Sequence, residues 1–595
     1  MTTLHDDPAG FAEDALRGFI DAHADEVRPV PGGVVRLRPT RPRKVAVIVG
    51  GGSGHYPAFC GLVGEGMADG AVVGNVFTSP SAADAAEVAR HADAGGGVLL
   101  LTGNYAGDVM NFTMALDRLA DEGIDARYVV VTDDIASAPV GQEDQRRGIA
   151  GNLTVFKAAA AAAERGDDLD AVERIARHAN DRTRTLGVAF DGCTLPGSAS
   201  PLFTVREGHM GIGVGIHGEP GIGEVEMPSA RGLGRLLADR VLAEAPTSSN
   251  GRVAAVLNGL GRTKYEELFV VWATVSQLVR EKGLTVVEPE VGELVTSLDM
   301  AGCSLTLMWL DDELEPLWRA PAAAPAYRKG SAARPPDAAA AAAAAAGSVT
   351  HAVVPDRAAV SDRVDVPVSP VQLRPGPGRR AVRVLAAVEA ADREVRSVED
   401  ELGRLDAVAG DGDHGRGMVR GLTAAHLAAA EAVAAGADPG DTLVQAGKAW
   451  AGRAGGTSGV LWGAMLEAAG QTLPAGGEQW DDWELDPVRG AAEAVAAAIG
   501  AVRRIGRAEV GDKTLLDALV PFHAALLADP ARDLATAWSR AAAAARAAAG
   551  ATAELRPRTG RARPLADRSV GHADPGATSL ALVLSAVIGS PTGED

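Results

Sequence analysis

Lys44-Val-Ala-Val-Ile-Val49 runs directly into Gly50-Gly-Gly-Ser-Gly-His-Tyr-Pro57, and this stretch decides the fold of the first half of the chain. A short apolar run that ends in glycines predicts a buried strand whose carboxyl end opens a loop. Apolar runs follow at 98–101 and 128–131, and helical patterns at 82–91 and 110–119 lie between the runs. This alternation predicts βαβ units, a mainly parallel sheet, and ligands at the carboxyl ends of its strands.

The same alternation continues after residue 191 and predicts three more strands, at 253–257, 284–287 and 305–309. A chain of 595 residues is too long for one hydrophobic core, so we predict a multidomain α/β plus all-α protein. Two α/β subdomains, about residues 1–190 and 191–330, form an N-terminal domain, 1–330. An Ala/Pro-rich linker covers 331–380, and helical spacing predicts an all-α domain over 381–595.

Composition and charge exclude several classes of function. The net charge of −21 argues against nucleic-acid binding, and no basic aromatic stretch offsets it. The three cysteines lie far apart, which is typical of free thiols in a reducing compartment rather than of disulfides or a zinc site. The N-terminus is acidic and polar, and no apolar run approaches membrane-spanning length. We therefore expect a soluble, cytoplasmic protein with no membrane partner.

The glycine loop after the first strand contains Gly52, Ser53 and Gly54 and ends at His55. It matches neither Gly-x-Gly-x-x-Gly nor Gly-x-Ser-x-Gly, so a plain tight turn is one interpretation. Glycines at a strand end also let backbone N–H groups approach a ligand closely. Asp108 follows a neighbouring strand, and it either caps the next helix or forms an acid/base pair with His55 in one pocket.

A second histidine, His217, lies in the glycine-rich segment Gly215-Ile-His-Gly-Glu-Pro-Gly221. A histidine among glycines is poorly suited to core packing, and its ring can reach a ligand. A neutral imidazole can serve there as nucleophile, as acid or base, or as metal ligand. His209 is nearby but lies on the less glycine-rich side.

Three carboxylates fall within eight positions in Asp406-Ala-Val-Ala-Gly-Asp-Gly-Asp-His-Gly415. Helical spacing before this segment places Asp406 at a helix end, with Asp411 and Asp413 on the glycine turn. An all-oxygen cluster suits a hard cation such as Mg²⁺, which bridges to phosphates. The plainer interpretation is that Asp-Gly pairs mark a turn with solvated acids, and this stretch alone leaves both open.

Two loops in the helical region have the chemistry to contact a nucleotide. The first is a glycine turn with two hydroxyls at a predicted helix N-terminus, which is a phosphate-binding arrangement; it contains Gly456, Thr457 and Ser458. The second precedes the last helix and reads as a turn on its own; it contains Asp574, Pro575 and Gly576.

Residues 506–514 imitate a Walker A loop. Asp512 intrudes before Lys513, and no strand precedes the segment, so we reject a P-loop. Lys513 and Thr514 can still reach a nucleotide, or they can simply start a helix.

Taken together, these motifs resemble the dihydroxyacetone kinase family in its single-chain, ATP-dependent form. Seven motifs occur in the family's order over nearly the whole chain: GGSGH (51–55), NYAGDVMNF (104–112), GIHGEPG (215–221), GDGDHG (410–415), GGTSG (455–459), GDKTLLDAL (511–519) and DPGA (574–577). The resemblance implies an α/β ketose-binding domain in two subdomains, followed by a barrel of helices that carries ATP.

The resemblance also implies roles for single residues in the ketose pocket. His217 matches the histidine whose imidazole nitrogen adds to the substrate carbonyl and gives a covalent hemiaminal. His55 and Asp108 match residues that assist attack by the terminal hydroxyl. With the glycine loop, Gly52 to Gly54, they are assigned to ketose binding.

For the nucleotide, the resemblance implies that Asp406, Asp411 and Asp413 hold two Mg²⁺ ions that bridge the triphosphate. Phosphoryl transfer needs this kind of positioning and charge neutralisation more than covalent work by the protein. The residues assigned to ATP are His414, Gly456, Thr457, Ser458, Lys513, Thr514, Asp574, Pro575 and Gly576.

Two departures from the family pattern fall at the ketose pocket. Tyr56 stands where members commonly have Glu, and Gly103 stands where they commonly have Lys. Replacing Lys by Gly frees volume, so the chain resembles the erythrulose kinase branch more than enzymes dedicated to dihydroxyacetone. Whether the ketose is dihydroxyacetone or erythrulose, and which end is phosphorylated, stays open at this stage.

Other functions within the family are also considered. The sugar-binding part can serve as a ketose-sensing regulator, but such a protein would not need the acid cluster or the nucleotide loops. FAD-cleaving cyclase activity is a second alternative. Transfer from a phosphoprotein is a third, although those systems divide the two domains between chains. Family analogy also predicts a homodimer in which one chain's helical domain meets the other's α/β domain.

Overall fold

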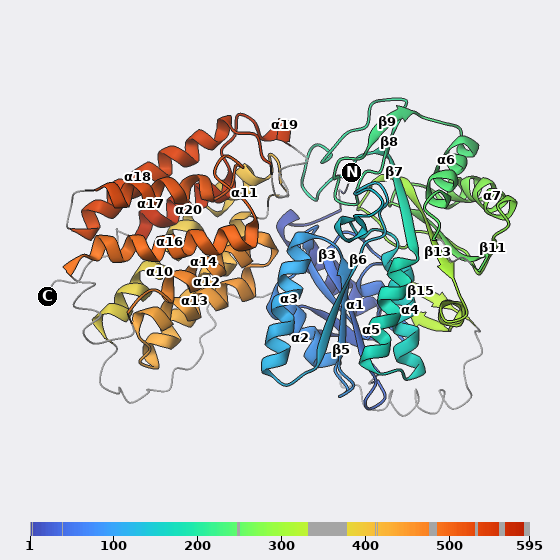
Figure 1. The fold of residues 1–595 in the computed structure, drawn as a ribbon, viewed down its shortest axis with the longest axis horizontal. Helices are drawn as coiled ribbons and strands as arrows, with labels where there is room; N and C mark the ends of the chain where they lie inside the picture. Colours follow the sequence, from blue (N-terminus) through green and yellow to red (C-terminus); the bar gives the residue numbers. More distant parts are fainter. Residues whose placement is uncertain are drawn as a thin grey trace.

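The computed structural model shows an α/β domain and an all-helical domain (Figure 1). It describes residues 2, 4–38, 40–246, 250–330, 378–410, 412, 414–474, 485–529, 533–558 and 566–587. The predicted linker lies outside these residues except for its last three positions. The fold class predicted from the sequence, α/β followed by all-α, is confirmed.

The first sheet has six strands in the order β1-β2-β4-β3-β5-β6. Neighbours are parallel from β4 through β3 and β5 to β6, while β1 and β2 form an antiparallel edge. This confirms the parallel sheet expected from the βαβ pattern. The strands are β1 (Val27–Val30), β2 (Gly33–Arg36), β3 (Ala46–Ser53), β4 (Gly70–Val76), β5 (Val98–Gly103) and β6 (Ala126–Val131).

Helices cover both faces of this sheet, because successive side chains of a strand point to opposite faces. From β3, Ala46 and Ile48 join the core beneath α2 and α3, together with Phe112. Val47 and Val49 join the larger core that includes residues of α4 and α5. The helices are α2 (Ala82–Ala92), α3 (Ala106–Asp121), α4 (Asn152–Arg165) and α5 (Leu169–Asp181).

The second sheet corrects the expectation that the parallel pattern continues. Its order is β11-β10-β13-β7-β8-β9 with β12 beside β10, and only β11 and β12 run parallel to β10. All other neighbours are antiparallel. Two parallel neighbours must be joined by a long crossover connection. In this sheet α7 provides it, because α7 follows β10 and precedes the two strands that run parallel to β10. The strands are β7 (Thr183–Asp191), β8 (His209–Ile212), β9 (Gly223–Glu226), β10 (Arg252–Gly259), β11 (Thr285–Val286), β12 (Glu290–Gly292) and β13 (Ala301–Leu310).

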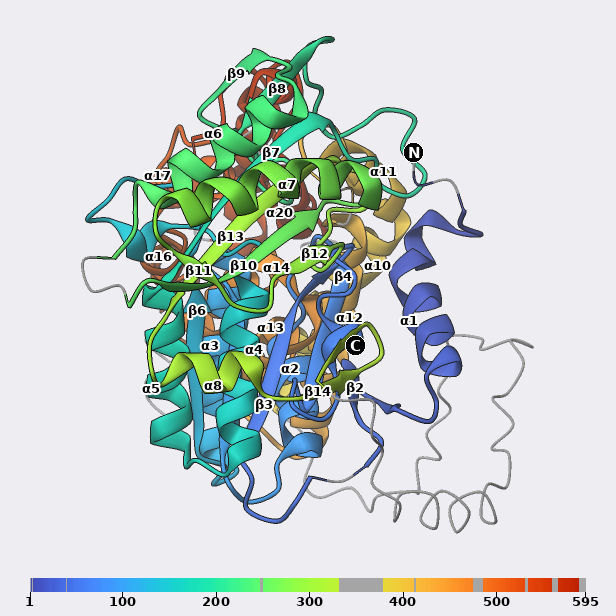
Figure 2. The ribbon, with the colours of Figure 1, turned by 90° about the vertical axis from the view of Figure 1, so that its right-hand side faces the viewer.

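Because β7 belongs to this second sheet, the change of subdomain falls before Thr183 rather than near residue 190. Two helices, α6 (Ala230–Leu242) and α7 (Tyr265–Glu281), lie across one face of the sheet (Figure 2). The remaining elements of the domain are small and peripheral: α1 (Phe11–Ala22), α8 (Leu314–Arg319), β14 (Ala322–Ala324) and β15 (Tyr327–Lys329).

The helical domain surrounds an apolar cavity of about 680 Å³. Its helices approach closely where small residues meet: a Cβ at Gly463 would lie 2.5 Å from that of Ala451 on the neighbouring helix. The helices are α10 (Arg379–Ser397), α11 (Glu399–Asp406), α12 (His414–Ala434), α13 (Pro439–Ala454), α14 (Gly456–Gly470), α16 (Pro487–Gly506), α17 (Leu516–Ala528), α18 (Leu534–Ala551), α19 (Ala566–Ser569) and α20 (Pro575–Ala586).

The two domains touch through α2 and α3 on one side and α13 and α14 on the other (Figure 1). The N-terminus of α14 forms hydrogen bonds with the α/β domain. The Gly456 N–H donates to the Ser79 carbonyl at 3.2 Å, and the Asn111 side chain donates to the Gly456 carbonyl at 3.2 Å. The chain's own helical domain therefore lies against its own α/β domain.

Candidate active site

The two histidines singled out in the sequence meet at the junction of the two sheets. Their Nε2 atoms lie 3.0 Å apart, although His55 and His217 are separated by 162 residues. His55 is buried and follows the carboxyl end of β3 in the first sheet. His217 is partly buried and lies in the loop between β8 and β9 of the second sheet. The structure thus brings both imidazoles to one point.

Hydrogen bonds fix how the His55 ring is protonated. Its Nδ1 lies 2.8 Å from the Thr296 carbonyl, which can only accept, so Nδ1 carries the hydrogen. Burial, reinforced by the charge of His217, lowers the pKa of His55 to about 3. The ring is therefore neutral and presents the lone pair of Nε2 to His217.

Glu219 contacts the Nδ1 side of the His217 ring, opposite to His55. One carboxylate oxygen lies 2.9 Å from His217 Nδ1, and the other accepts from the His217 backbone N–H at 3.0 Å. Burial alone would raise the pKa of Glu219, but the charge and hydrogen bond of His217, together with Arg147, hold it well below its ordinary value. Arg147 lies 3.9 Å from Glu219 and is itself anchored by Asp134 at 2.7 Å.

Aromatic side chains enclose the histidine pair. Phe77 stacks on His55 with ring centroids 5.0 Å apart, and it meets the His217 ring nearly at right angles, with centroids 5.1 Å apart. Tyr105 meets His217 at 4.6 Å. A Cβ at Gly52 would lie 2.6 Å from the Thr78 backbone nitrogen, so glycine there lets the Phe77 loop lie directly on the end of β3. These walls shield His55 from water and His217 in part, which strengthens the polar interaction between the two rings.

Asp108 lies in the first turn of α3, three residues after Tyr105, and it is buried. It does not cap the helix, because the N-cap position is Tyr105. Its charge contributes to raising the pKa of Tyr128, after the larger effect of burial. The carboxylate therefore lies inside the α/β domain, at the end of β5 where the sequence predicted it.

The two departures from the family pattern have different surroundings. Tyr56 is 47% exposed, and its ring packs 6.0 Å from that of Phe19 in α1. At Gly103, a Cβ would lie 2.9 Å from the Tyr105 ring and 3.0 Å from the Gly148 carbonyl. A side chain at 103 would thus displace the aromatic ring that contacts His217, while Tyr56 faces outward.

The glycine turn assigned to ATP is docked on the α/β domain. The Gly456 N–H and carbonyl are both used in the contacts with Ser79 and Asn111, so this amide does not point to a phosphate here. Thr457 follows in the first turn of α14, and its hydroxyl would lie 3.6 Å from a Cβ at Gly107. Ser458 occupies the next position of the same helix.

At the acidic turn, Asp406 ends α11 and accepts from the Gly412 N–H at 2.9 Å. A Cβ at Gly410 would lie 2.4 Å from an Asp406 carboxylate oxygen, so a side chain there would displace this carboxylate. Asp411 and Asp413 lie outside the described residues. Within the described part of the chain no group of three or more potential ligands gathers, so the predicted metal set stays a prediction.

Three of the residues assigned to ATP are engaged in structural contacts. His414 is buried and lies 2.9 Å from the Ser579 hydroxyl of α20. The Lys513 ammonium donates to the Ser569 carbonyl at 2.6 Å and to the Leu555 carbonyl at 3.1 Å. Thr514 accepts weakly from the Leu516 N–H at 3.3 Å, as a helix start would. These contacts shape the loops around the acidic turn.

Asp574 caps α20 and accepts from the Ala577 N–H at 2.7 Å, with Pro575 and Gly576 in the first turn. Burial is the main reason that the pKa of Asp574 rises to about 7, and repulsion from Asp517 and Asp406 adds to it. The charges of Asp517 and Asp406 therefore act on Asp574, although the described carboxylates do not form a cluster of three metal ligands. A bound divalent cation would relieve this repulsion, so the donor set fits Mg²⁺.

Sequence reasoning missed four groups of the site: Glu219, Tyr105, Phe77 and Thr296. Glu219 and Tyr105 lie inside quoted motifs, and a carboxylate two residues from a loop histidine was a usable signal. Phe77 and Thr296 lie in segments with no chemical signature, so only the tertiary structure reveals them.

Two general findings complete the description. No helix in the described ranges is long and apolar enough to span the bilayer. Cys60, Cys193 and Cys303 are free thiols, as the sequence predicted. Burial raises the pKa of Cys193 and Cys303 to about 12, so these two thiols are unreactive.

Comparison with known proteins identifies the family. A model described as the Dak1 domain matches residues 17–326, and one described as the DAK2 domain matches residues 408–589. The chain is 58% identical to a D-erythrulose kinase of Mycolicibacterium smegmatis, over 98% of this chain and 97% of that protein. It is 53% identical to an L-erythrulose kinase of Pectobacterium atrosepticum, over 99% and 96%.

A solved structure agrees with this. The dihydroxyacetone kinase of C. freundii in complex with AMP-PNP and Mg²⁺ is 29% identical and covers 99% of both chains, with a TM-score of 0.51. Both domains and their order are shared over the full length. The chain therefore belongs to the dihydroxyacetone kinase family, in its single-chain form, and to the erythrulose kinase branch of that family.

Proposed function

We propose that the protein is an ATP-dependent kinase that phosphorylates a terminal hydroxyl of a short-chain ketose, and that its substrate is a four-carbon ketose, erythrulose. The observation that carries the proposal is the His55–His217 pair, enclosed by aromatic rings and held by Glu219. The nucleotide-binding domain lies against the same α/β domain. The relatives matched from end to end are kinases, which favours this function over a ketose-sensing regulator or an FAD-cleaving cyclase.

His217 would act as the nucleophile that holds the ketose. As arranged here, its Nε2–H donates to His55, because the acceptor lone pair belongs to His55. Transfer of that proton to His55 frees the lone pair of His217 Nε2 to form a bond with the ketone carbon. His55 gives the proton up readily, since burial disfavours its cation. The ketone oxygen takes it. The imidazolium of the adduct keeps its Nδ1 proton and donates it as a hydrogen bond to the ionised Glu219 carboxylate, so the two charges balance.

The covalent bond would orient the terminal hydroxyl for phosphorylation. Orientation of this kind can be worth several kcal/mol of barrier, at about the lower end of effective-molarity effects. It also selects a ketone over a polyol such as glycerol, which has no carbonyl to trap. His55 and Asp108 remain the proposed bases for the terminal hydroxyl proton.

On the helical side, Asp406, Asp411 and Asp413 would hold Mg²⁺, which neutralises the triphosphate when ATP is bound. The repulsion that Asp517 and Asp406 exert on Asp574, which a cation would relieve, supports this proposal. Gly456, Thr457 and Ser458, with the Asp574 loop, stay the proposed nucleotide contacts. For Gly456 this requires the interdomain contacts to rearrange. A homodimer and a cytoplasmic location also remain proposals, which light scattering and cell fractionation would test.

The sharpest test of the proposal is the adduct itself. Erythrulose labelled with ¹³C at the ketone should give a bound sp³ carbon signal with the wild-type protein and none with His217→Asn. His209→Asn is the matched control, because His209 lies in the neighbouring strand β8 outside the histidine pair. An unchanged ketone resonance in the wild-type complex would contradict covalent binding. A panel of D-erythrulose, L-erythrulose, dihydroxyacetone and glycerol in an ADP-release assay then decides the substrate.

A further inference from the structure

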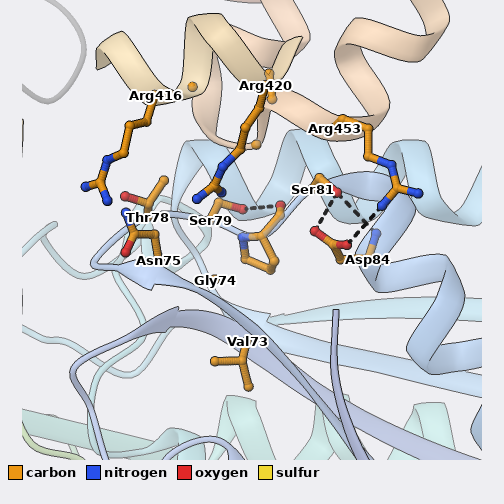
Figure 3. Close-up of a pocket in the computed structure, with 14 residues that line it drawn as sticks. Val73, Gly74, Asn75, Thr78, Ser79, Ser81, Asp84, Arg416, Arg420 and Arg453 are labelled. Carbon is orange, nitrogen blue, oxygen red and sulfur yellow. Dashed lines mark hydrogen bonds and ion pairs between the residues drawn. The ribbon is translucent and has the colours of Figure 1, made fainter. Parts of the chain in front are cut away.

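A small cavity of about 70 Å³ lies between the two domains, and hydrogen-bond donors dominate its polar lining (Figure 3). From the helical domain, Arg416 and Arg420 reach into it from α12, and Arg453 reaches in from the last turn of α13. The opposite wall is the loop between β4 and α2, which contributes Asn75, Thr78, Ser79 and Ser81.

The carboxylates nearest to two of these arginines do not form hydrogen bonds with them. Arg453 lies 3.9 Å from Asp84, and Arg420 lies 3.6 Å from Glu13. The Arg453 and Arg420 side chains are 58% and 49% exposed, and ion pairs of this kind contribute little to stability. Arg416 and Arg420 are four residues apart, so they lie on one face of α12 and converge on the same space.

Size and chemistry point to one kind of ligand. A water molecule needs about 10–15 Å³ of such volume, so the cavity has room for roughly five waters, which is the number of heavy atoms in a phosphate. It is too small for a nucleoside or a sugar. Guanidinium groups match phosphate oxygens in pairs, and hydroxyls complete the set of donors. We propose that this cavity binds a phosphate dianion, either free or as the terminal group of a nucleotide, when the two domains are docked.

The cavity lies between the histidine pair of the α/β domain and the acidic turn of the helical domain. Its loop also carries Phe77, whose ring packs on both His55 and His217. Its other wall, α12, begins directly after the acidic turn of 406–413. A phosphate held here would join the domains through charged hydrogen bonds on both sides. The part of the inference that concerns ATP rests on the proposed kinase function, whereas binding of free phosphate does not.

The competing explanation is that the arginines only hold the domains together electrostatically. Calorimetric titration of the full chain with inorganic phosphate, without Mg²⁺, nucleotide or ketose, separates the two. Arg420→Gln should weaken phosphate binding by roughly tenfold, as loss of a charged hydrogen bond does. Asp84→Asn should tighten it by about two- to fivefold, because a competing anion is removed from the cavity. Asn retains an acceptor for the Ser81 hydroxyl that Asp84 binds at 2.7 Å.

Arg393→Gln is the matched control, since Arg393 is 73% exposed and, among the described residues, forms its ion pair along its own helix with Glu389. Arg453→Gln is a second cavity variant and should behave like Arg420→Gln. Equal phosphate affinity in the wild type and all four variants would overturn the proposal, as would tighter binding by Arg420→Gln.

Nucleotide titrations then identify the source of the phosphate. If the terminal phosphate of ATP occupies the cavity, Arg420→Gln weakens ATP binding and leaves ADP binding unchanged. If free phosphate occupies it, both nucleotides bind to Arg420→Gln as they do to the wild type, and only the binding of inorganic phosphate is weakened. Failure of the kinase function would appear as no nucleotide binding at all, with the phosphate result standing separately.

Discussion

Replacing Asp574 with Asn should stabilise the helical domain at neutral and alkaline pH. Asp574 caps α20 from a buried position, and burial, with repulsion from Asp517 and Asp406, raises its pKa to about 7 from an ordinary 3.8. Asn is an equally good N-cap, and its oxygen can accept from the Ala577 N–H as the carboxylate does at 2.7 Å. The substitution therefore removes the charge and keeps the cap.

The pKa shift sets both the sign and the size of the effect. Between about pH 4 and pH 7 the folded wild type retains a proton that the unfolded chain has released, so its stability falls as pH rises through this window. Above pH 7 Asp574 is ionised in the folded protein as well, and the full free-energy cost of burying its charge lowers the stability. A shift of roughly three units corresponds to about 4 kcal/mol at most. Asp574→Asn lacks this dependence, so it should match the wild type near pH 4 and exceed it increasingly up to pH 7.

The stability difference can be measured by hydrogen exchange of residues 575–586 in the full chain. The measurement covers pH 4 to pH 8.5 in the presence of EDTA, and the rates are corrected for intrinsic exchange. The control is Asp533→Asn, because Asp533 caps α18 in the same domain and accepts from the Thr536 N–H at 2.8 Å. Hydrogen bonds from Thr536 lower the pKa of Asp533, so its carboxylate stabilises the fold at neutral pH and loses that effect in acid. Wild-type and Asp574→Asn profiles that stay parallel across this range would refute the reasoning.

Two further substitutions test the ketose pocket and the acidic turn separately. Glu219→Gln should lower kcat/KM for the ketose on the order of a hundredfold, because a neutral amide cannot balance the positive charge that the His217 imidazole carries in the adduct; steady-state kinetics with unchanged kcat/KM would contradict this role. Gly410→Ala places a Cβ 2.4 Å from the Asp406 carboxylate, so Mg²⁺-dependent ATP binding should be lost in calorimetry while the ¹³C ketose adduct persists. Gly550→Ala is its control, since a Cβ there meets nothing within 4 Å.

The second sheet shows where local sequence patterns lose information. Its strands β8 and β9 have four residues each, and β9 is fully exposed, so neither produces the apolar run or alternation that marks a strand. The antiparallel order of this sheet depends on pairing between strands that are far apart in the sequence, which local patterns do not record. By contrast, β3, β5 and β6 are apolar runs bounded by turn residues, and the sequence predicted each of them.

The sequence by itself determined the domain types and the residues with suitable chemistry. The spacing of apolar residues that marks a helix or strand is a property of short segments, so it can be read without the fold. The glycines around His55 and His217 likewise indicate accessible backbone whatever the tertiary structure is. Only the tertiary structure decided that the two rings meet at 3.0 Å, that Glu219 and Thr296 fix their protons, and that three arginines converge on one loop. Those contacts join segments tens to hundreds of residues apart, and burial, which sets the pKa of His55 and Asp574, exists only after the segments have packed.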